Sequence, residues 1–249
     1  MKLYKQKNPD SSPASNIRER NYRDCDTKLL IIWNISDFFN KLFSEKRLSK
    51  YFLIHKDEGK AISHYRCNIE LSEAFYSCIS VLEVALRNAI CRELTKMAGR
   101  EDWYVYFLST PGLKDFNKYI TIANQHIAAR KEIVSHSKII AELTLGFWVA
   151  MFNTEYEKLL WKDLRRAFPF MPKQIRKRKT IAKSLNRIRN LRNRIFHHEP
   201  ICWNIEVVLE LHKEMLTVMG WINKDLPEWY SEMDRLGEVT TLIKGRLDW

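Results

Sequence analysis

The chain has 249 residues, of which 45% are hydrophobic, and it carries a formal net charge of +12. This length supports a real core in one large or two small domains, and the scarcity of glycine and proline, seven of each, favours helices over a turn-rich β architecture. The sequence has neither an apolar run of about 18 residues nor a secretory signal, so we expect a soluble, cytoplasmic protein with no membrane partner.

Three regions are expected along the chain. Residues 1–26 are polar and predict a flexible arm. Residues 27–60 predict an N-terminal helical extension. The apolar residues within 27–41 indicate a helix, and a polar connection follows this helix. Residues 61–249 are predicted to form the main, all-helical domain.

The first half of the main domain contains the clearest helical pattern. Apolar residues recur at intervals of three and four over residues 62–97, which is the spacing of one buried helix face, and Gly99 follows as a stop signal. The aromatic residues of 103–107 favour a place in the core, with stacking on RNA bases as the alternative. A turn at Pro111 precedes a predicted helix over residues 113–134.

The second half is predicted to add three helices. One begins near Leu145, and its aromatic residues allow the same two interpretations, core or base stacking. The next is expected over residues 172–198, because its apolar residues form one stripe and Pro200 disfavours helical backbone before it. The last covers roughly residues 203–223. The stripe of the middle helix consists of Ile181, Leu185, Ile188, Leu191 and Ile195.

Positive charge is concentrated in one segment. No acidic residue lies between Asp163 and Glu199, and this window holds twelve Lys and Arg residues, so its charge equals that of the whole chain. Such a local excess predicts a polyanionic partner, usually a phosphate backbone, and a solvated helix face is the alternative. We expect RNA to bind through residues 165–194, with Lys173, Arg176, Lys177, Arg178, Lys179, Lys183, Arg187 and Arg194 as the contacts.

The basic segment ends in Arg192-Asn193-Arg194-Ile195-Phe196-His197, which contains the residue types needed to cut RNA without a metal ion. Histidine exchanges protons near neutral pH, and arginine holds a phosphate with a planar fork of donors that keeps its charge. We therefore predict Arg192, Asn193 and His197 as catalytic residues. On a helix Arg189 lies in one row with Asn193 and His197, and Arg189 and His198 are predicted as support.

Helical geometry limits what one copy of this motif can do. Arg192 and His197 point about 140° apart around a helix axis, so a single copy is an incomplete active site. Two copies facing each other across a two-fold axis bring two arginines and two histidines into one cleft, and the two-fold dimer is the commonest oligomer. The alternative is a polar helix end, in which His197 caps carbonyl groups and Arg192 pairs with Glu199.

Other features of the sequence carry weaker signals. Glu83 and Arg87 are spaced as helical neighbours, which predicts either a structural ion pair or a brace that orients the Arg/His cluster. The remaining histidines lack metal-ligand spacing, the five cysteines are scattered and no Gly-rich phosphate loop occurs. We therefore expect reduced cysteines, no metal ion and no cofactor.

Three ordered blocks resemble the Abi-like family, the abortive-infection proteins of the D/F type, in which a HEPN domain occurs. The resemblance extends over about residues 47–223. Its first block combines residues 68–75 with residues 81–90, and its middle block combines residues 145–148 with residues 159–161. The C-terminal block reads Ile188-Arg189-Asn190-Leu191-Arg192-Asn193-Arg194-Ile195-Phe196-His197-His198-Glu199-Pro200-Ile201.

This resemblance implies an all-α, HEPN-type helical bundle with additional N-terminal helices and a two-fold dimer with a composite cleft. It implies metal-independent cleavage of RNA by Arg192 and His197, with support from Asn193, in bacterial antiphage defence of the toxin–antitoxin kind. A protein or RNA antitoxin is then expected as a partner. Some HEPN toxins carry a modifiable tyrosine two residues after the histidine, and Glu199 occupies that position here.

Three functions are consistent with these patterns. The leading hypothesis is an endoribonuclease in which His197 moves protons and Arg192 stabilises charge on the phosphate, giving products with 2′,3′-cyclic phosphate or 3′-phosphate ends. The second is a non-catalytic HEPN protein that holds a structured non-coding RNA through its basic segment. The third is a helical interaction protein whose basic face meets an acidic partner protein.

Overall fold

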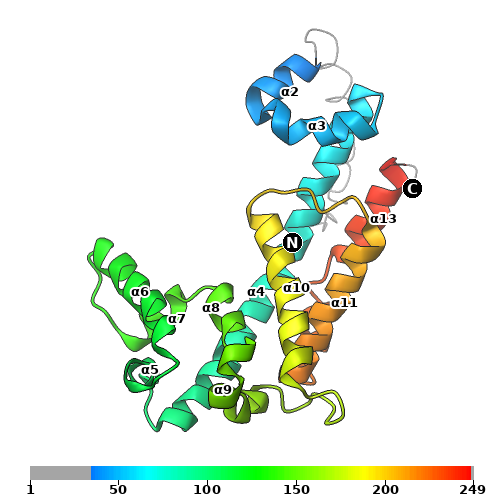
Figure 1. Cartoon of the computed structure of the whole chain (residues 1–249). Coiled ribbons are helices and arrows are strands. Elements are labelled where there is room, and N and C mark those ends of the chain that lie inside the picture. The colour runs from blue at the N-terminus through cyan, green and yellow to red at the C-terminus, as the bar shows by residue number, and fades with distance from the viewer. Residues whose placement is uncertain (1–34, 248–249) are drawn as a thin grey trace, which may run out of the picture. The chain divides into compact units, whose positions relative to one another are not determined.

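A computed structural model of the protein describes residues 35–247 (Figure 1). Over this range the chain is helical and has no strand, which confirms the all-α fold class. The predicted arm over residues 1–26 and the first part of the predicted helix over residues 27–41 lie outside the described residues. The chain divides into two compact units, Met1–Ser63 and His64–Trp249, and the boundary falls inside one long helix.

The described part of the first unit contains α2 (Ile35–Phe43), α3 (Glu45–Ile54) and the start of α4 (Glu58–Ala98). The sequence did not predict α3, whose buried side chains are Leu48 and Tyr51. The polar connection is shorter than expected, because the side chain of Asp57 accepts a hydrogen bond from the Lys60 N–H at 2.7 Å and so caps α4.

The long helix α4 confirms the predicted helix over residues 62–97, and Gly99 follows it with φ +68°. Its buried side chains, such as Leu71, Phe75, Leu82 and Leu86, repeat with helical spacing. By length and composition alone α4 is also apolar enough to cross a membrane, since an 18-residue window has a mean hydropathy of 1.3. In the structure 44% of that window is buried, and the core helix of a soluble protein meets the same criteria.

Short helices that share an aromatic core follow α4. Trp103, Phe107, Phe147 and Trp148 are all at most 2% exposed, and the Phe147 and Trp148 rings lie 4.9 Å apart. This burial confirms the core interpretation for these four rings and excludes them as a base-stacking surface, whereas Tyr106 of the first segment is 40% exposed. The helices are α5 (Tyr104–Ser109), α6 (Asn117–Ala129), α7 (His136–Glu142), α8 (Leu145–Ala150) and α9 (Glu157–Leu164).

Two predictions for this region are wrong in detail. The helix expected over residues 113–134 is shorter, since α6 ends at Ala129 and Lys131 leaves the helical region with φ +57°. The sequence did not predict α7 or α9 as separate helices. Both are too short for a hydrophobic period to be visible.

The helix that carries the Arg/His motif is α10 (Arg178–Phe196), drawn yellow in Figure 1. It packs beside α8 and beside α11 (Ile205–Ile222), which is drawn orange. The predicted apolar stripe of α10 is buried, and α11 matches the predicted last helix. α10 is shorter at both ends than the expected 172–198. Residues 172–177 instead form turns held by Arg176, which donates a hydrogen bond to the Pro169 carbonyl at 2.7 Å.

The chain continues through α12 (Leu226–Ser231) and α13 (Leu236–Leu247), neither of which was predicted. Side-chain contacts tie both to α4. The hydroxyl groups of Ser77 and Tyr230 lie 3.1 Å apart, and Arg246 contacts both carboxylate oxygens of Glu70 at 2.7 Å. The last two helices thus pack against α4.

Candidate functional site

The end of α10 is a Schellman motif built from residues of the Arg/His motif. The Glu199 N–H donates to the Arg194 carbonyl at 2.8 Å, and the His198 N–H donates to the Ile195 carbonyl at 3.0 Å. His198 occupies the left-handed position of this motif with φ +56°, where glycine is usual. The helix therefore ends through local capping before Pro200 can act.

His197 lies just beyond α10 as its C-cap residue. Its N–H donates to the Asn193 carbonyl at 2.9 Å, so the expected row of Asn193 and His197 is kept although His197 is outside the helix. Both side chains are exposed, and Arg189 one turn earlier is half-buried. The chain after the motif is anchored to α4, because the Ile201 N–H donates to the buried side chain of Asn68 at 2.7 Å.

Arg192 is held on two sides. Its Nε donates to Oε1 of Glu83 on α4 at 3.0 Å, and its guanidinium carbon lies 4.1 Å from the centre of the Phe196 ring. Its two terminal nitrogens bond to no other residue in the described part of the chain. The predicted alternative in which Arg192 pairs with Glu199 is wrong, since Glu199 lies 3.7 Å from Arg194.

The expected ion pair between Glu83 and Arg87 is absent among the described residues, because the Glu83 carboxylate points to α10 and takes Arg192 as its partner. Glu83 therefore contacts Arg192 directly, which is the position that the predicted orienting role for Glu83 requires. Arg87 is not part of that contact. Its Nε is buried and has no hydrogen-bond partner within residues 35–247.

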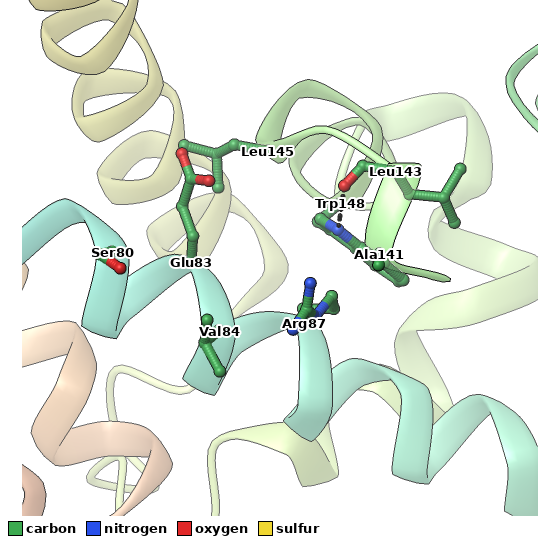
Figure 2. Close-up of a pocket in the computed structure, with 8 residues that line it drawn as sticks. All are labelled: Ser80, Glu83, Val84, Arg87, Ala141, Leu143, Leu145 and Trp148. Carbon is green, nitrogen blue, oxygen red and sulfur yellow. Dashed lines mark hydrogen bonds between the residues drawn. The ribbon is translucent and has the colours of Figure 1, made fainter. Parts of the chain in front are cut away.

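A pocket of about 120 Å³ separates this face of α4 from α7 and α8 (Figure 2). Glu83 and Arg87 project into it from α4, and Leu143 and Trp148 form part of the opposite wall. Trp148 is fixed there by a hydrogen bond from Nε1 to the Leu143 carbonyl at 3.2 Å. The sequence did not indicate this pocket, because its far wall depends on the unpredicted helix α7.

The predicted RNA-binding residues divide into two chemical groups. The four arginines are engaged within the protein: Arg176 bonds to backbone carbonyls, Arg178 contacts Glu157 at 2.7 Å, Arg187 contacts Glu214 at 2.7 Å, and Arg194 bonds to the Pro200 carbonyl. The side chain of Arg178 is only 12% exposed. These arginines hold the fold around α10.

The four lysines, in contrast, are exposed, and their side chains have no hydrogen bond or ion pair within the described residues. Lys179 and Lys183 lie one helical turn apart on the solvent face of α10, and this face continues along the helix to His197. We call Lys173, Lys177, Lys179 and Lys183 the lysine track. Like the terminal nitrogens of Arg192, these side chains have no partner among the described residues and are available to a polyanion.

Exposed apolar side chains lie on the other side of Arg192. Tyr76 of α4 is 61% exposed, Phe196 is 42% exposed, and their rings lie 6.4 Å apart. Ile69 and Val84 are exposed on the same face of α4, at helical spacing from Tyr76. We call Ile69, Tyr76, Val84 and Phe196 the aromatic patch. Arg192 covers one face of the Phe196 ring, and all four patch residues remain exposed in the described part of the chain.

The cysteines of the described residues are free thiols in buried or partly buried places. Burial raises the pKa of the Cys78 thiol to about 12 and that of Cys91 to about 11, so both are protonated and poor nucleophiles at neutral pH. Within residues 35–247, no group of three or more His, Cys, Asp or Glu side chains is placed to hold a metal ion.

Comparison of the chain with protein-family models, curated proteins and solved structures finds no match.

Proposed function

We propose that this protein is a metal-independent endoribonuclease of the HEPN type, active in the cytoplasm in bacterial antiphage defence and restrained by a protein or RNA antitoxin. The observation that carries the proposal is the presentation of Arg192. Glu83 fixes its Nε and Phe196 covers one face, while no described residue occupies the terminal nitrogens, which can bind a phosphate. The exposed imidazole of His197 follows at the end of the same helix.

These groups suit cleavage by an internal nucleophile. His197 removes the proton from a ribose 2′-OH, or protonates the leaving 5′-oxygen, as an imidazole does near neutral pH. The 2′-oxygen bonds to phosphorus as the bond to the 5′-oxygen breaks, giving a 2′,3′-cyclic phosphate and a 5′-hydroxyl. Arg192 stabilises the negative charge that develops on the phosphate oxygens, with Asn193 as a neighbouring donor.

A second copy of the chain completes the site in this proposal. One copy supplies one arginine and one histidine that point apart around α10. The aromatic patch lies directly beside Arg192 and is the kind of exposed apolar surface that a partner covers. A two-fold dimer through this patch brings two Arg/His sets together.

RNA reaches the site along the lysine track. Its lysines have no partner among the described residues, and the solvent face of α10 leads from Lys179 to His197. Binding through such lysines depends on the release of counterions and weakens steeply with salt.

The test compares wild type with Arg192→Ala, His197→Ala and the double variant, both as growth on inducible expression and as cleavage of purified RNA. We expect toxicity and RNA fragmentation in wild type only, with cleavage reduced at least about 100-fold in each single variant. His126→Ala is the matched control, because His126 is also exposed but lies on α6. Cleavage should persist in EDTA and leave 2′,3′-cyclic phosphate or 3′-phosphate ends.

Cleavage that EDTA abolishes, or that the double variant retains, would contradict this mechanism. The RNA-binding alternative predicts copurified RNA, no turnover, and equal binding by wild type and His197→Ala. An acidic protein that copurifies without nucleic acid would instead support the interaction-protein alternative. The absorbance ratio at 260 and 280 nm separates these last two outcomes.

A further inference from the structure

An aromatic side chain stands exposed in the middle of the basic segment, in the loop that leads into α10. Phe170 is 51% exposed, whereas Phe168 and Met171 of the same loop are at most 1% exposed. These two buried neighbours anchor the loop in the core without the Phe170 ring. A large apolar ring that the fold leaves in solvent is available to a partner.

The backbone that carries this ring is held at three points. The Phe170 N–H donates a hydrogen bond to the Trp221 carbonyl, near the end of α11, at 3.1 Å. Arg176 donates to the carbonyls of the residues on both sides of Phe170, Pro169 at 2.7 Å and Met171 at 3.0 Å. A group that stands on a fixed backbone loses little entropy when it binds, so its contacts contribute more to affinity.

The charge around Phe170 indicates what kind of partner the ring meets. The chain has no acidic residue from position 164 to position 198, and Asp163 just before this range pairs with Arg166 at 3.1 Å. The exposed side chains of Lys173 and Lys177 follow in the same loop and have no partner among the described residues. A ring among cations suits a nucleic-acid strand, because a base stacks on the ring while the phosphates meet the lysines.

The Phe170 loop and the proposed cleavage site lie at opposite ends of α10 (Figure 1). The 19 residues of α10 give it a length of about 28 Å. A stacked strand rises about 3.4 Å per nucleotide, so roughly eight nucleotides or fewer bridge the two ends. Steps of three and four residues connect one exposed stripe on this helix. The stripe consists of Lys179, Lys183, Arg187, Asn190, Arg194 and, at its end, His197.

We propose that Phe170 is an anchor on which an unpaired RNA base stacks, while the strand follows the exposed stripe of α10 to His197. The inference rests on the proposed function, because it takes RNA as the ligand. A base inside a double helix is covered on both faces by its neighbours, whereas unpaired bases stack readily on aromatic side chains. Phe170 therefore favours single-stranded RNA that is long enough to reach from the ring to the cleavage site.

The first test measures binding and does not depend on cleavage. The probe is a labelled 2′-O-methyl oligouridine of about twelve nucleotides, which has no free 2′-OH and so resists the proposed reaction. Fluorescence anisotropy with the full-length protein should show binding weakened at least about fivefold by Phe170→Ala and by Phe170→Leu, which keeps an apolar side chain without a ring. Phe170→Trp should bind at least as well as wild type. Binding of a long RNA duplex should change less than about twofold in all three variants, since it needs only the phosphates.

Trp229→Ala is the matched control for the loss of an exposed ring. Trp229 is 56% exposed, but it lies on α12 beside Glu228 and close in sequence to Glu232, so its surroundings repel a phosphate backbone. This variant should bind the oligouridine as wild type does. Thermal unfolding checks that each variant is folded, and Phe170→Leu keeps the test valid if Phe170→Ala is not.

The second test uses cleavage and separates binding from chemistry. With single-stranded RNA of about twelve nucleotides, Phe170→Ala should raise KM at least about fivefold and leave kcat unchanged, because the ring binds the strand away from the reacting phosphate. Cleavage of a dinucleotide, which is too short to reach the ring, should be the same in Phe170→Ala and wild type.

The outcomes separate this inference from the proposed function. Equal binding of the oligouridine by wild type and Phe170→Ala would overturn the anchor, and so would an equal loss for the single strand and the duplex or an equal loss in Trp229→Ala. The ribonuclease proposal would still stand if wild type cuts RNA. A partner protein that Phe170→Ala loses while RNA binding persists would assign the ring to a protein contact instead. Binding that depends on Phe170, in a protein that cuts no RNA, would support the anchor and reject the ribonuclease.

Discussion

At the scale of single residues, the contact between Glu83 and Arg192 fixes the guanidinium that we propose as the phosphate-binding group. A free arginine loses side-chain entropy when it binds, whereas here Glu83 and Phe196 already fix the guanidinium. Preorganised donors of this kind supply the greater part of the rate enhancement in many enzymes. Glu83 is a positioning residue in this account, because it acts through Arg192.

Replacement of Glu83 tests this role. Glu83→Ala releases the Nε of Arg192, and we expect kcat for RNA cleavage to fall by about tenfold to 100-fold, since small misplacements of catalytic groups cost that much. Glu83→Gln keeps an oxygen that accepts from Nε, so it should recover most of the lost rate. A purely structural role for Glu83 would lower the melting temperature of both variants and would not produce this recovery.

His198 stores backbone strain directly after the motif. A non-glycine residue in the left-handed region costs about 1 kcal/mol or more, and His198 holds φ +56° there. The comparison that isolates this cost is His198→Gly against His198→Ala, because both variants lose the same imidazole. We expect the glycine variant to be more stable by about 1 kcal/mol, or roughly 2–4 °C in melting temperature for a domain of this size.

Thermal unfolding followed by circular dichroism at 222 nm measures the difference. Equal stability of the two variants would mean that the chain relaxes to a negative φ at this position. It would also remove the Schellman motif as the reason why α10 ends where it does.

At the scale of elements, the basic segment shows what the sequence can and cannot predict. Its charge and the buried stripe of α10 follow from the residue pattern alone. The division into structural arginines and a free lysine track does not, because it depends on partners in other elements, such as Glu157 of α9 for Arg178 and Glu214 of α11 for Arg187.

This division makes a paired prediction. Replacing Lys177, Lys179 and Lys183 together by alanine should weaken RNA binding. The plot of log K against log salt should also become less steep by about 2, at roughly 0.7 per lost phosphate contact. The unfolding free energy should stay within about 0.5 kcal/mol of wild type for each surface change. Arg178→Ala should do the opposite, losing about 2 kcal/mol of stability with its charged hydrogen bonds and leaving the salt slope nearly unchanged.

Fluorescence anisotropy with a labelled single-stranded RNA, titrated at several salt concentrations, gives the slope, and urea unfolding gives the stability. If Arg178→Ala lowers the slope as much as the lysine variant does, the arginines also contact RNA. The structural division of the segment would then be wrong.

The helices also differ in how well the sequence alone predicts them. α4, α10 and α11 were predictable because they are long enough for a hydrophobic period to repeat. The short helices α3, α7, α9 and α12 were not, since each is too short for such a repeat to be visible. The pocket beside Glu83 and Arg87 was hidden too, because part of its far wall comes from α7.

At the scale of the whole molecule, the three sequence blocks that suggested the Abi-like resemblance meet around one place. Glu83 and Asn68 of the first block bond to Arg192 and Ile201 of the C-terminal block, and Trp148 of the middle block lines the pocket beside Glu83. Residues 109 and 133 positions apart in the sequence thus become direct neighbours. The three blocks therefore lie against one another around the contact between Glu83 and Arg192.

The proposed two-fold dimer with a composite cleft leads to a prediction about a mixture of two variants. Arg192→Ala dimers contain two histidines without the arginine, and His197→Ala dimers contain two arginines without the histidine, so each alone should be inactive. A heterodimer of the two variants has one arginine and one histidine in the shared cleft. We expect coexpressed, doubly tagged heterodimers to cut RNA at least about tenfold faster than either homodimer, because the proton shuttle and the charge stabiliser are again present together.

Introducing Tyr76→Glu on both chains, which places a charge in the aromatic patch, should abolish the heterodimer in analytical ultracentrifugation and the recovered activity with it. A purified heterodimer without recovered activity would show that Arg192 and His197 of the same protomer must act together, and the two-fold cleft would then have no catalytic role.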